Sequence, residues 1–149
     1  RLDAAQLVRF HSTPTDPESE CARIRAYLDE QGPIDLCLLG LGKNGHIGLN
    51  EPAHDLAPRV HQTELTTSTR QHQMLRSHDQ KRVYGMTLGI ADILHSRRIL
   101  LLVTGSEKRL PLQNLRIPKV RTSFPASLLH LHQNTTVLCD VRASEPAPG

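Results

Sequence analysis

The sequence is poor in aromatic residues and in long apolar runs. It has no tryptophan, two tyrosines and two phenylalanines among 149 residues. Proteins that bind single-stranded nucleic acid stack bases on aromatic side chains, so this shortage argues against that class of partner. The longest clearly apolar run, residues 99–103, is far shorter than a membrane helix, and the chain opens on no signal-peptide pattern. We therefore expect a soluble, cytoplasmic protein whose partners include neither nucleic acid nor a membrane.

Cysteine is also scarce, and histidine is not clustered. Cys21, Cys37 and Cys139 form no C-x-x-C pair, and an odd number does not suggest a disulfide framework. We expect all three to be small, buried apolar side chains. The nine histidines include no H-E-x-x-H motif and no Cys/His cluster. The sequence therefore predicts neither a metal site nor another cofactor.

Basic residues are concentrated in the last third of the chain. The whole sequence has a formal net charge of +3, whereas residues 93–149 carry eight basic and three acidic side chains. Either a solvated face or attraction for an anionic small molecule explains such a bias. The length, with 38% hydrophobic residues, predicts one folded domain over residues 1–149. Its tail, residues 144–149, is rich in proline and alanine and is predicted to be disordered.

Short apolar segments alternate with helical patterns along the chain. Asp16 and Pro17 are typical of a helix start, and Gly32 of a helix end. The nearly continuous apolar run 34–39 predicts a strand buried on both faces, as in a parallel sheet. We predict helices over residues 17–31, 67–76, 90–95, from 104 onward and 125–132, and strands over 34–39, 60–65, 83–88, 98–103 and 135–139. This order predicts an α/β three-layer sandwich with a mostly parallel, Rossmann-like sheet and ligands at the carboxyl ends of its strands.

A glycine-rich segment follows the first predicted strand. Residues 40–45 fit the dinucleotide-binding pattern G-x-G-x-x-G, but the glycine and proline that follow argue against the helix which that motif requires. We interpret residues 40–52 as an extended active-site loop. His46 and Glu51 are its candidates for proton transfer, because a histidine near a carboxylate can exchange protons at neutral pH. From the residues alone, His46 is either a catalytic histidine or an ordinary surface histidine.

A second candidate site follows the strand predicted over residues 98–103. Residues 104–108 read Thr-Gly-Ser-Glu-Lys. Backbone N–H groups at a helix start, two hydroxyls and a lysine together suit a phosphate group. The spacing is not that of a Walker A loop, so nucleotide hydrolysis is not indicated. Taken in isolation, the segment is better interpreted as an ordinary strand-to-helix turn with Thr104 as its cap and Lys108 in solvent.

In combination, these motifs resemble a known family. Residues 34–36 (Ile-Asp-Leu), 40–52, 87–89 (Thr-Leu-Gly) and 104–108 occur in the order and at the spacing found in the glucosamine-6-phosphate and galactosamine-6-phosphate deaminase/isomerases. The resemblance extends from about residue 16 to residue 140. The Lys-Asn-Gly-His form of the loop is most similar to the galactosamine-6-phosphate (AgaI-type) branch. The resemblance implies the α/β fold that these enzymes share with 6-phosphogluconolactonases.

The resemblance also implies a substrate and residue roles. The substrate is an amino-sugar 6-phosphate, isomerised from aldose to ketose with release of ammonia. His46 assists ring opening, Glu51 belongs to its proton relay, and Lys108 binds the phosphate. Asn44 is the third residue that we predict to be catalytic; it replaces an aspartate of the glucosamine-type enzymes, which leaves Glu51 as the only motif carboxylate beside His46. A phosphate-binding arginine follows the loop in the family, and Arg76 is the nearest candidate. The other candidates for substrate binding are Gly42, Gly45, Thr104 and Gly105.

The start of the chain departs from the family pattern. Family members carry an amino-terminal portion with a phosphate loop and a proton-shuttling aspartate, and residues 1–33 match neither. Together with the absent initiator methionine, this leads us to expect the carboxyl-terminal part of a longer enzyme, inactive by itself. The alternatives are a 6-phosphogluconolactonase, against which Asn50-Glu51-Pro52 argues, and a non-catalytic module that binds sugar phosphates. The sequence leaves galacto or gluco specificity open and is compatible with a homo-oligomer.

Overall fold

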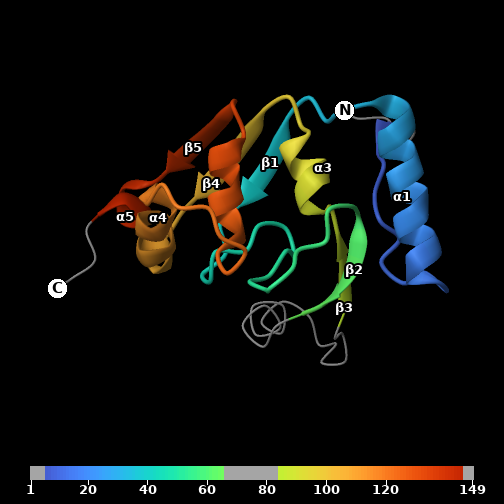
Figure 1. Cartoon of the computed structure of the whole chain (residues 1–149), viewed down its shortest axis with the longest axis horizontal. Coiled ribbons are helices and arrows are strands. Elements are labelled where there is room, and N and C mark those ends of the chain that lie inside the picture. Colours follow the sequence, from blue (N-terminus) through green and yellow to red (C-terminus); the bar gives the residue numbers. More distant parts are fainter. Residues whose placement is uncertain (1–5, 66–83, 146–149) are drawn as a thin grey trace.

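A parallel sheet with helices packed against it forms the main body of the protein (Figure 1). The computed structural model describes residues 6–65 and 84–145. The strands are β1 (Cys37–Gly40), β2 (His61–Glu64), β3 (Tyr84–Thr87), β4 (Ile99–Val103) and β5 (Thr135–Cys139). The helices are α1 (Pro17–Gln31), α3 (Ile90–Leu94), α4 (Arg109–Arg116) and α5 (Val141–Ser144), with 3₁₀ helices η2 (Ser106–Lys108) and η3 (Pro125–Leu131). Within the described ranges, no helix is long and apolar enough to cross a membrane.

Helix α1 begins and ends where the sequence predicts. The side chain of Asp16 accepts hydrogen bonds from the backbone N–H groups of Glu18 and Ser19, which caps the amino terminus. Gly32 ends the helix with a φ of 84°, a conformation that glycine adopts without strain. The apolar side of the helix buries Cys21 and Ile24 in a small core cluster with Val60.

The main sheet has the strand order β1-β4-β5, and both pairs of neighbours are parallel. The parallel sheet and the α/β class therefore agree with the sequence prediction. Strand β5 occupies the predicted range, and β4 begins one residue later than predicted. Strand β1 begins at Cys37, three residues after the start of the predicted strand.

The two faces of this sheet differ in burial. One face places Cys37, Ile99 and Leu101 in the main core beneath residues of α3, α4 and η3. The other face carries Leu38, Leu102 and Leu138, whose exposed fractions are 60%, 40% and 51%. The prediction that the 34–39 strand is buried on both faces is therefore wrong for the described residues. The reason is that the described helices lie over only one face.

Strands β2 and β3 form a separate antiparallel sheet, with His61 paired to Thr87 and Glu64 to Tyr84. Both strands lie within predicted strand ranges, but they are not part of the parallel sheet. Helix α1 packs against β2. The helix predicted over residues 67–76 lies outside the described residues.

The carboxyl-terminal part differs from the prediction in detail. The segment predicted as a helix over residues 125–132 is the 3₁₀ helix η3. The short helix α5 is capped by Asp140, whose carboxylate accepts from Ala143 N at 2.8 Å, and was not predicted. Of the predicted disordered tail, Ser144 ends this helix and Glu145 forms an ion pair with Arg109. Residues 146–149 lie outside the described residues.

The three cysteines have two kinds of environment. Cys21 and Cys37 are buried, and burial raises the pKa of both thiols, which agrees with their predicted role as apolar side chains. Cys139 is exposed, so the expectation that it is buried is wrong. It ends β5, which is an edge strand of the sheet among the described residues.

Candidate functional site

The two motifs singled out from the sequence follow neighbouring strands. Residues 41–52 follow β1, and residues 104–108 follow β4. The two strands are parallel, and Gly40 at the end of β1 is paired with Leu102 near the end of β4. The sheet therefore brings both motifs to its carboxyl-terminal edge, where α/β proteins bind ligands.

The loop after β1 is held by its own backbone and forms no helix. Gly42 N donates to the carbonyl oxygen of His46 at 2.9 Å, and Gly45 N donates to that of Gly42 at 3.0 Å. A short antiparallel bridge joins Ile47 to Asn50. The predicted extended loop is confirmed, and the helix of a dinucleotide-binding motif is absent from these described residues.

Asn44 lies between His46 and Glu51 and contacts both. Its Nδ2 donates to Glu51 Oε2 at 2.7 Å, while its Oδ1 lies 2.8 Å from His46 Nδ1 and 3.2 Å from the backbone N of His46. His46 Nδ1 lies 3.4 Å from Glu51 Oε2. The side chain of Glu51 is 9% exposed and that of His46 is 22% exposed. The structure thus brings together the three residues predicted to be catalytic.

These contacts determine which ring nitrogen of His46 carries the proton. Glu51 accepts from the amide NH₂ of Asn44, so the amide oxygen faces the histidine. An amide oxygen only accepts hydrogen bonds, and its contact with Nδ1 therefore requires a proton on Nδ1. In the neutral ring the basic lone pair then lies on Nε2. When Nε2 takes up a proton, the nearby negative charge of Glu51 stabilises the ring.

Two glycines of the loop are required by close packing. A Cβ on Gly42 would lie 2.4 Å from Cγ and Nδ1 of His46, so the imidazole lies directly against this backbone. A Cβ on Gly45 would lie 2.2 Å from the ring of Phe124, and Gly45 has a φ of 87°. Ala126 N donates to the carbonyl oxygen of Gly45 at 2.8 Å, which ties the loop to η3. Both glycines therefore position His46, whereas their predicted contact with substrate is a proposal.

The Thr-Leu-Gly motif at residues 87–89 holds the far end of the loop. Thr87 Oγ1 accepts from Leu49 N at 3.1 Å, and the carbonyl oxygen of Leu88 accepts from Asn50 Nδ2 at 2.9 Å. Gly89 packs so tightly that a Cβ would lie 2.4 Å from the backbone N of Arg59. The motif contributed to the family resemblance, but no role was predicted for its residues.

The segment after β4 has a different character. Thr104 is exposed. Gly105, with a φ of 96°, donates its N–H to both carboxylate oxygens of Asp140, at 3.2 and 3.1 Å. This N–H was predicted to face a phosphate, and in the structure a carboxylate of the chain already accepts from it. Asp140 comes 35 residues later in the sequence, so no local pattern could reveal the contact.

Lys108 is partly buried, and burial lowers its pKa. The negative charge of Glu107 opposes this shift, and the positive charge of Lys43 adds to it. Lys43 in the first motif therefore acts electrostatically on Lys108 in the second. Lys43 was not among the predicted site residues, although its charge and its place in the glycine loop were visible in the sequence. Arg76 lies outside the described residues.

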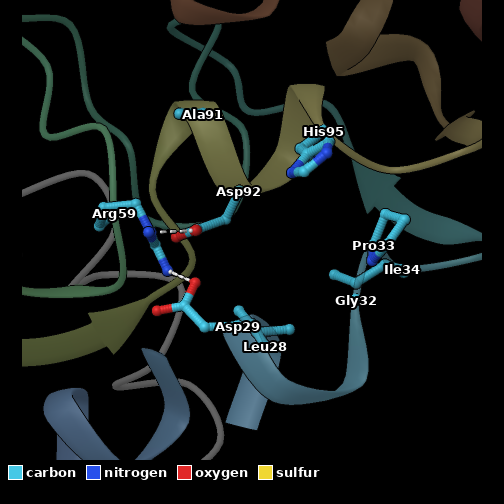
Figure 2. Close-up of a pocket in the computed structure, with 9 residues that line it drawn as sticks. All are labelled: Leu28, Asp29, Gly32, Pro33, Ile34, Arg59, Ala91, Asp92 and His95. Carbon is cyan, nitrogen blue, oxygen red and sulfur yellow. Dashed lines mark hydrogen bonds and ion pairs between the residues drawn. The ribbon is translucent and has the colours of Figure 1, made fainter. Parts of the chain in front are cut away.

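A cavity of about 250 Å³ lies apart from these motifs and contains none of the predicted site residues (Figure 2). Arg59 on its wall donates to Asp29 at 2.6 Å and to Asp92 at 2.8 Å. Hydrogen bonding to Asp29 is the main cause that raises the pKa of Arg59. These ion pairs connect the end of α1 to α3. Across residues 6–65 and 84–145, no group of three or more His, Cys, Asp and Glu side chains is arranged to hold a metal ion.

Comparison with known sequences gives consistent matches. The chain matches the family described as "Glucosamine-6-phosphate isomerases/6-phosphogluconolactonase" over residues 1–138. It is 46% identical over 129 residues to the protein named "Putative deaminase AgaI" of Escherichia coli (strain K12), covering 87% of this chain and 51% of that protein. It is 42% identical over 135 residues to glucosamine-6-phosphate deaminase 1 of Bacillus subtilis (strain 168), covering 89% and 56%. The chain spans about half the length of these curated relatives.

Solved structures with the same fold include enzymes of two kinds. A monomeric glucosamine-6-phosphate deaminase matches with a TM-score of 0.82 and 41% identity, over 88% of this chain and 55% of that one. The 6-phosphogluconolactonase of Trypanosoma brucei matches with a TM-score of 0.65 at 20% identity, over 95% of this chain and 58% of that one. At that identity the second match shows the fold alone. The predicted fold class is confirmed.

Proposed function

Because the chain belongs to the glucosamine-6-phosphate isomerase/6-phosphogluconolactonase family, and within it to the amino-sugar-6-phosphate deaminases, we propose that it carries the ring-opening machinery of such a deaminase. The observation that supports this most strongly is the contact of Asn44 with both His46 and Glu51. This contact leaves the lone pair of the neutral imidazole on Nε2, the form of the ring that can accept a proton from a sugar hydroxyl.

In the proposed step, His46 transfers one proton within the sugar. Nε2 takes the proton of the hydroxyl on C1 and delivers it to the ring oxygen, while the bond between C1 and the ring oxygen breaks and C1 becomes an aldehyde carbon. The imidazole is positively charged between the two transfers, and Glu51 stabilises this form from 3.4 Å. Asn44 keeps the ring in the required tautomer, and Gly42 supports its face. No other reactant is needed.

Lys108 is the proposed partner of the 6-phosphate. A partly desolvated ammonium attracts an anion more strongly than a fully hydrated one, and a bound phosphate stabilises its charged form. Thr104 supplies an exposed hydroxyl in the same segment. The N–H of Gly105 donates to Asp140, so the proposed contribution of Gly105 to phosphate binding is the backbone conformation of the segment. Arg76 remains a proposed second phosphate ligand.

We propose galactosamine 6-phosphate as the first substrate to test, with ketose phosphate and ammonia as the products of the complete reaction. The support is the Lys-Asn-Gly-His form of the loop and the 46% identity to the AgaI protein. Glucosamine 6-phosphate is the alternative, because relatives named as its deaminases are 42% identical. The later proton transfer between C1 and C2 requires a carboxylate that the resemblance places outside this chain.

Ring opening can be measured separately from deamination. Exchange between the α and β anomers of galactosamine 6-phosphate requires an open ring, and nuclear magnetic resonance measures its rate. We expect the chain to accelerate this exchange and His46→Gln to reduce the acceleration by about 100-fold or more. His54→Gln is the matched control, because the His54 side chain is 96% exposed and should not matter. No acceleration by the folded chain, or an equal loss in both variants, would refute the proposal.

A further inference from the structure

A groove of about 470 Å³ lies along β5, on the face of the main sheet that carries α4 and η3. We call it the β5 groove. Val137 of the strand lines it, together with Leu112 and Leu115 of α4 and Leu129 of η3. Val137 is paired with the fully buried Leu101, yet it is 40% exposed. The helices thus cover β4 and leave β5 partly open, which creates an apolar groove of the size that holds a small ligand.

The two ends of the β5 groove differ in polarity. Arg109, at the start of α4, donates to the carbonyl oxygen of Arg142 in α5 at 2.9 Å. The start of α4 therefore lies near the end of β5, and the helix runs back along the strand. Arg116, the last residue of α4, accordingly lines the groove toward the start of β5, whereas Cys139 lines it at the other end.

The polar end has hydrogen-bonding groups to offer a ligand. His130 Nε2 lies 2.7 Å from the carbonyl oxygen of Leu115, so Nε2 carries the proton, and Nδ1 has no partner among the described residues. Arg116 forms no ion pair within residues 6–65 and 84–145. None of the described residues that line the groove is acidic. By contrast, the guanidinium of Arg59 in the smaller cavity is paired with two carboxylates (Figure 2).

We propose that the β5 groove binds a free medium-chain fatty acid. The carboxylate pairs with Arg116, because a guanidinium forms strong charged hydrogen bonds with a carboxylate. The alkyl tail lies along Leu112, Leu129 and Val137, where it is removed from water. Strand β5 has five residues and is about 13 Å long, so a tail of about eight carbons suits the groove.

This site also gives a role to a feature of the sequence that the proposed function leaves partly unexplained. Residues 93–149 carry eight basic and three acidic side chains, and the proposed phosphate site uses one of these basic residues, Lys108. Arg116 is a second member of the same set. The β5 groove shares no residue with the motifs after β1 and β4, so the proposal is independent of the proposed function.

Cys139 provides a local measurement of binding, because it is exposed at one end of the groove while Cys21 and Cys37 are buried. Iodoacetamide, a neutral reagent, alkylates accessible thiols, and mass spectrometry identifies the modified cysteine. We expect octanoate to slow the alkylation of Cys139 saturably, by about fivefold or more. The alcohol 1-octanol lacks the charge and acetate lacks the tail. Each should require a concentration about tenfold higher or more for the same protection.

Two variants test the two parts of the groove. Arg116→Gln should raise the octanoate concentration for half-maximal protection by about tenfold or more, whereas Arg98→Gln, at an exposed arginine outside the groove, should leave it unchanged. Val137→Asp adds a negative charge to the apolar part and should abolish protection. Val120→Asp is its control, because Val120 is 43% exposed and lies outside the groove. Circular dichroism shows whether each variant is folded.

Several results would overturn the proposal. They are an unchanged alkylation rate in octanoate, protection by 1-octanol or acetate at the same concentration as octanoate, and equal affinity for octanoate in Arg116→Gln and Arg98→Gln. Arg116→Gln decides the outcome if Val137→Asp does not fold. Saturable protection by octanoate that only Arg116→Gln and Val137→Asp weaken is the result that the proposal predicts.

Discussion

The motifs after β1 and β4 follow neighbouring strands, yet they are held in different ways. The first is packed and hydrogen-bonded: Glu51 is 9% exposed, and the backbone N–H of Leu49 donates to the side chain of Thr87 on β3. The second is more open, with Thr104 exposed and Lys108 partly exposed. A proton transfer requires a fixed geometry, whereas a phosphate can be held by a long side chain that adjusts. The difference agrees with the proposed roles of the two motifs, proton transfer for the first and phosphate binding for the second.

The largest expected effect is on the packed motif. Gly45→Ala places a Cβ 2.2 Å from the ring of Phe124 at a φ of 87°, and both overlap and backbone strain oppose folding. We expect the free energy of unfolding to fall by about 2–4 kcal/mol in a denaturant titration. Gly40→Ala is the control: a Cβ there meets nothing within 4 Å, and its effect should stay within about 1 kcal/mol. Similar losses in the two variants would contradict the packing described for the loop.

A smaller effect should separate two threonines, one from each region. Thr87→Val removes the acceptor of Leu49 N and should lower the free energy of unfolding by about 1–3 kcal/mol. Thr104→Val changes an exposed side chain and should stay within about 0.5 kcal/mol. Thermal or denaturant unfolding measures both. If Thr104→Val costs as much as Thr87→Val, the second segment is as tightly held as the first, and the contrast between them fails.

The smallest effect concerns the electrostatic link between the motifs. The positive charge of Lys43 contributes to the lowered pKa of Lys108, so Lys43→Ala should raise that pKa toward its ordinary value of 10.5. Burial is the larger cause and remains, so the rise should be partial. Titration of the Lys108 side chain by nuclear magnetic resonance measures it. Lys119→Ala, which removes an exposed charge that is not among the causes of the shift, should leave the pKa unchanged.

The same shift fixes the sign of a pH dependence. Because the pKa of Lys108 is lower in the folded chain than in the unfolded chain, the unfolded chain binds more protons between the two values. The contribution of Lys108 to the free energy of unfolding therefore rises with pH across the window between the lowered value and 10.5. Lys43→Ala narrows this window and should reduce the rise. An unchanged or steeper rise in that variant would show that Lys43 does not act on Lys108.

Local patterns in the sequence predicted local structure well. Asp16, Pro17 and Gly32 mark the ends of α1 because caps act within a few residues, and the run 135–139 predicted β5. The burial of side chains was harder to predict, because a leucine in β1 is buried or exposed according to elements far away in the chain. For this reason Leu38 was expected to be buried and is found on the exposed face of the sheet.

The predicted site residues show the same limit. Asn44, His46 and Glu51 lie within one loop, and their grouping followed from the motif. The hydrogen bonds that hold the two motifs join residues far apart in the sequence. Leu49 and Thr87 are separated by 38 residues, and Gly105 and Asp140 by 35. No periodicity or spacing reports such pairs. The sequence therefore identified the candidate chemistry, and the structure was needed to find what positions it.

The most direct test of the account is the state of the His46 ring with and without substrate. Nitrogen-15 nuclear magnetic resonance of the neutral ring should show the proton on Nδ1 and the lone pair on Nε2. Galactosamine 6-phosphate should shift the Nε2 signal in the wild-type chain, and the shift should require a higher sugar concentration in Lys108→Ala. A proton on Nε2 in the neutral ring, or a His46 signal that no amino-sugar phosphate changes, would contradict the claim that this loop opens the sugar ring.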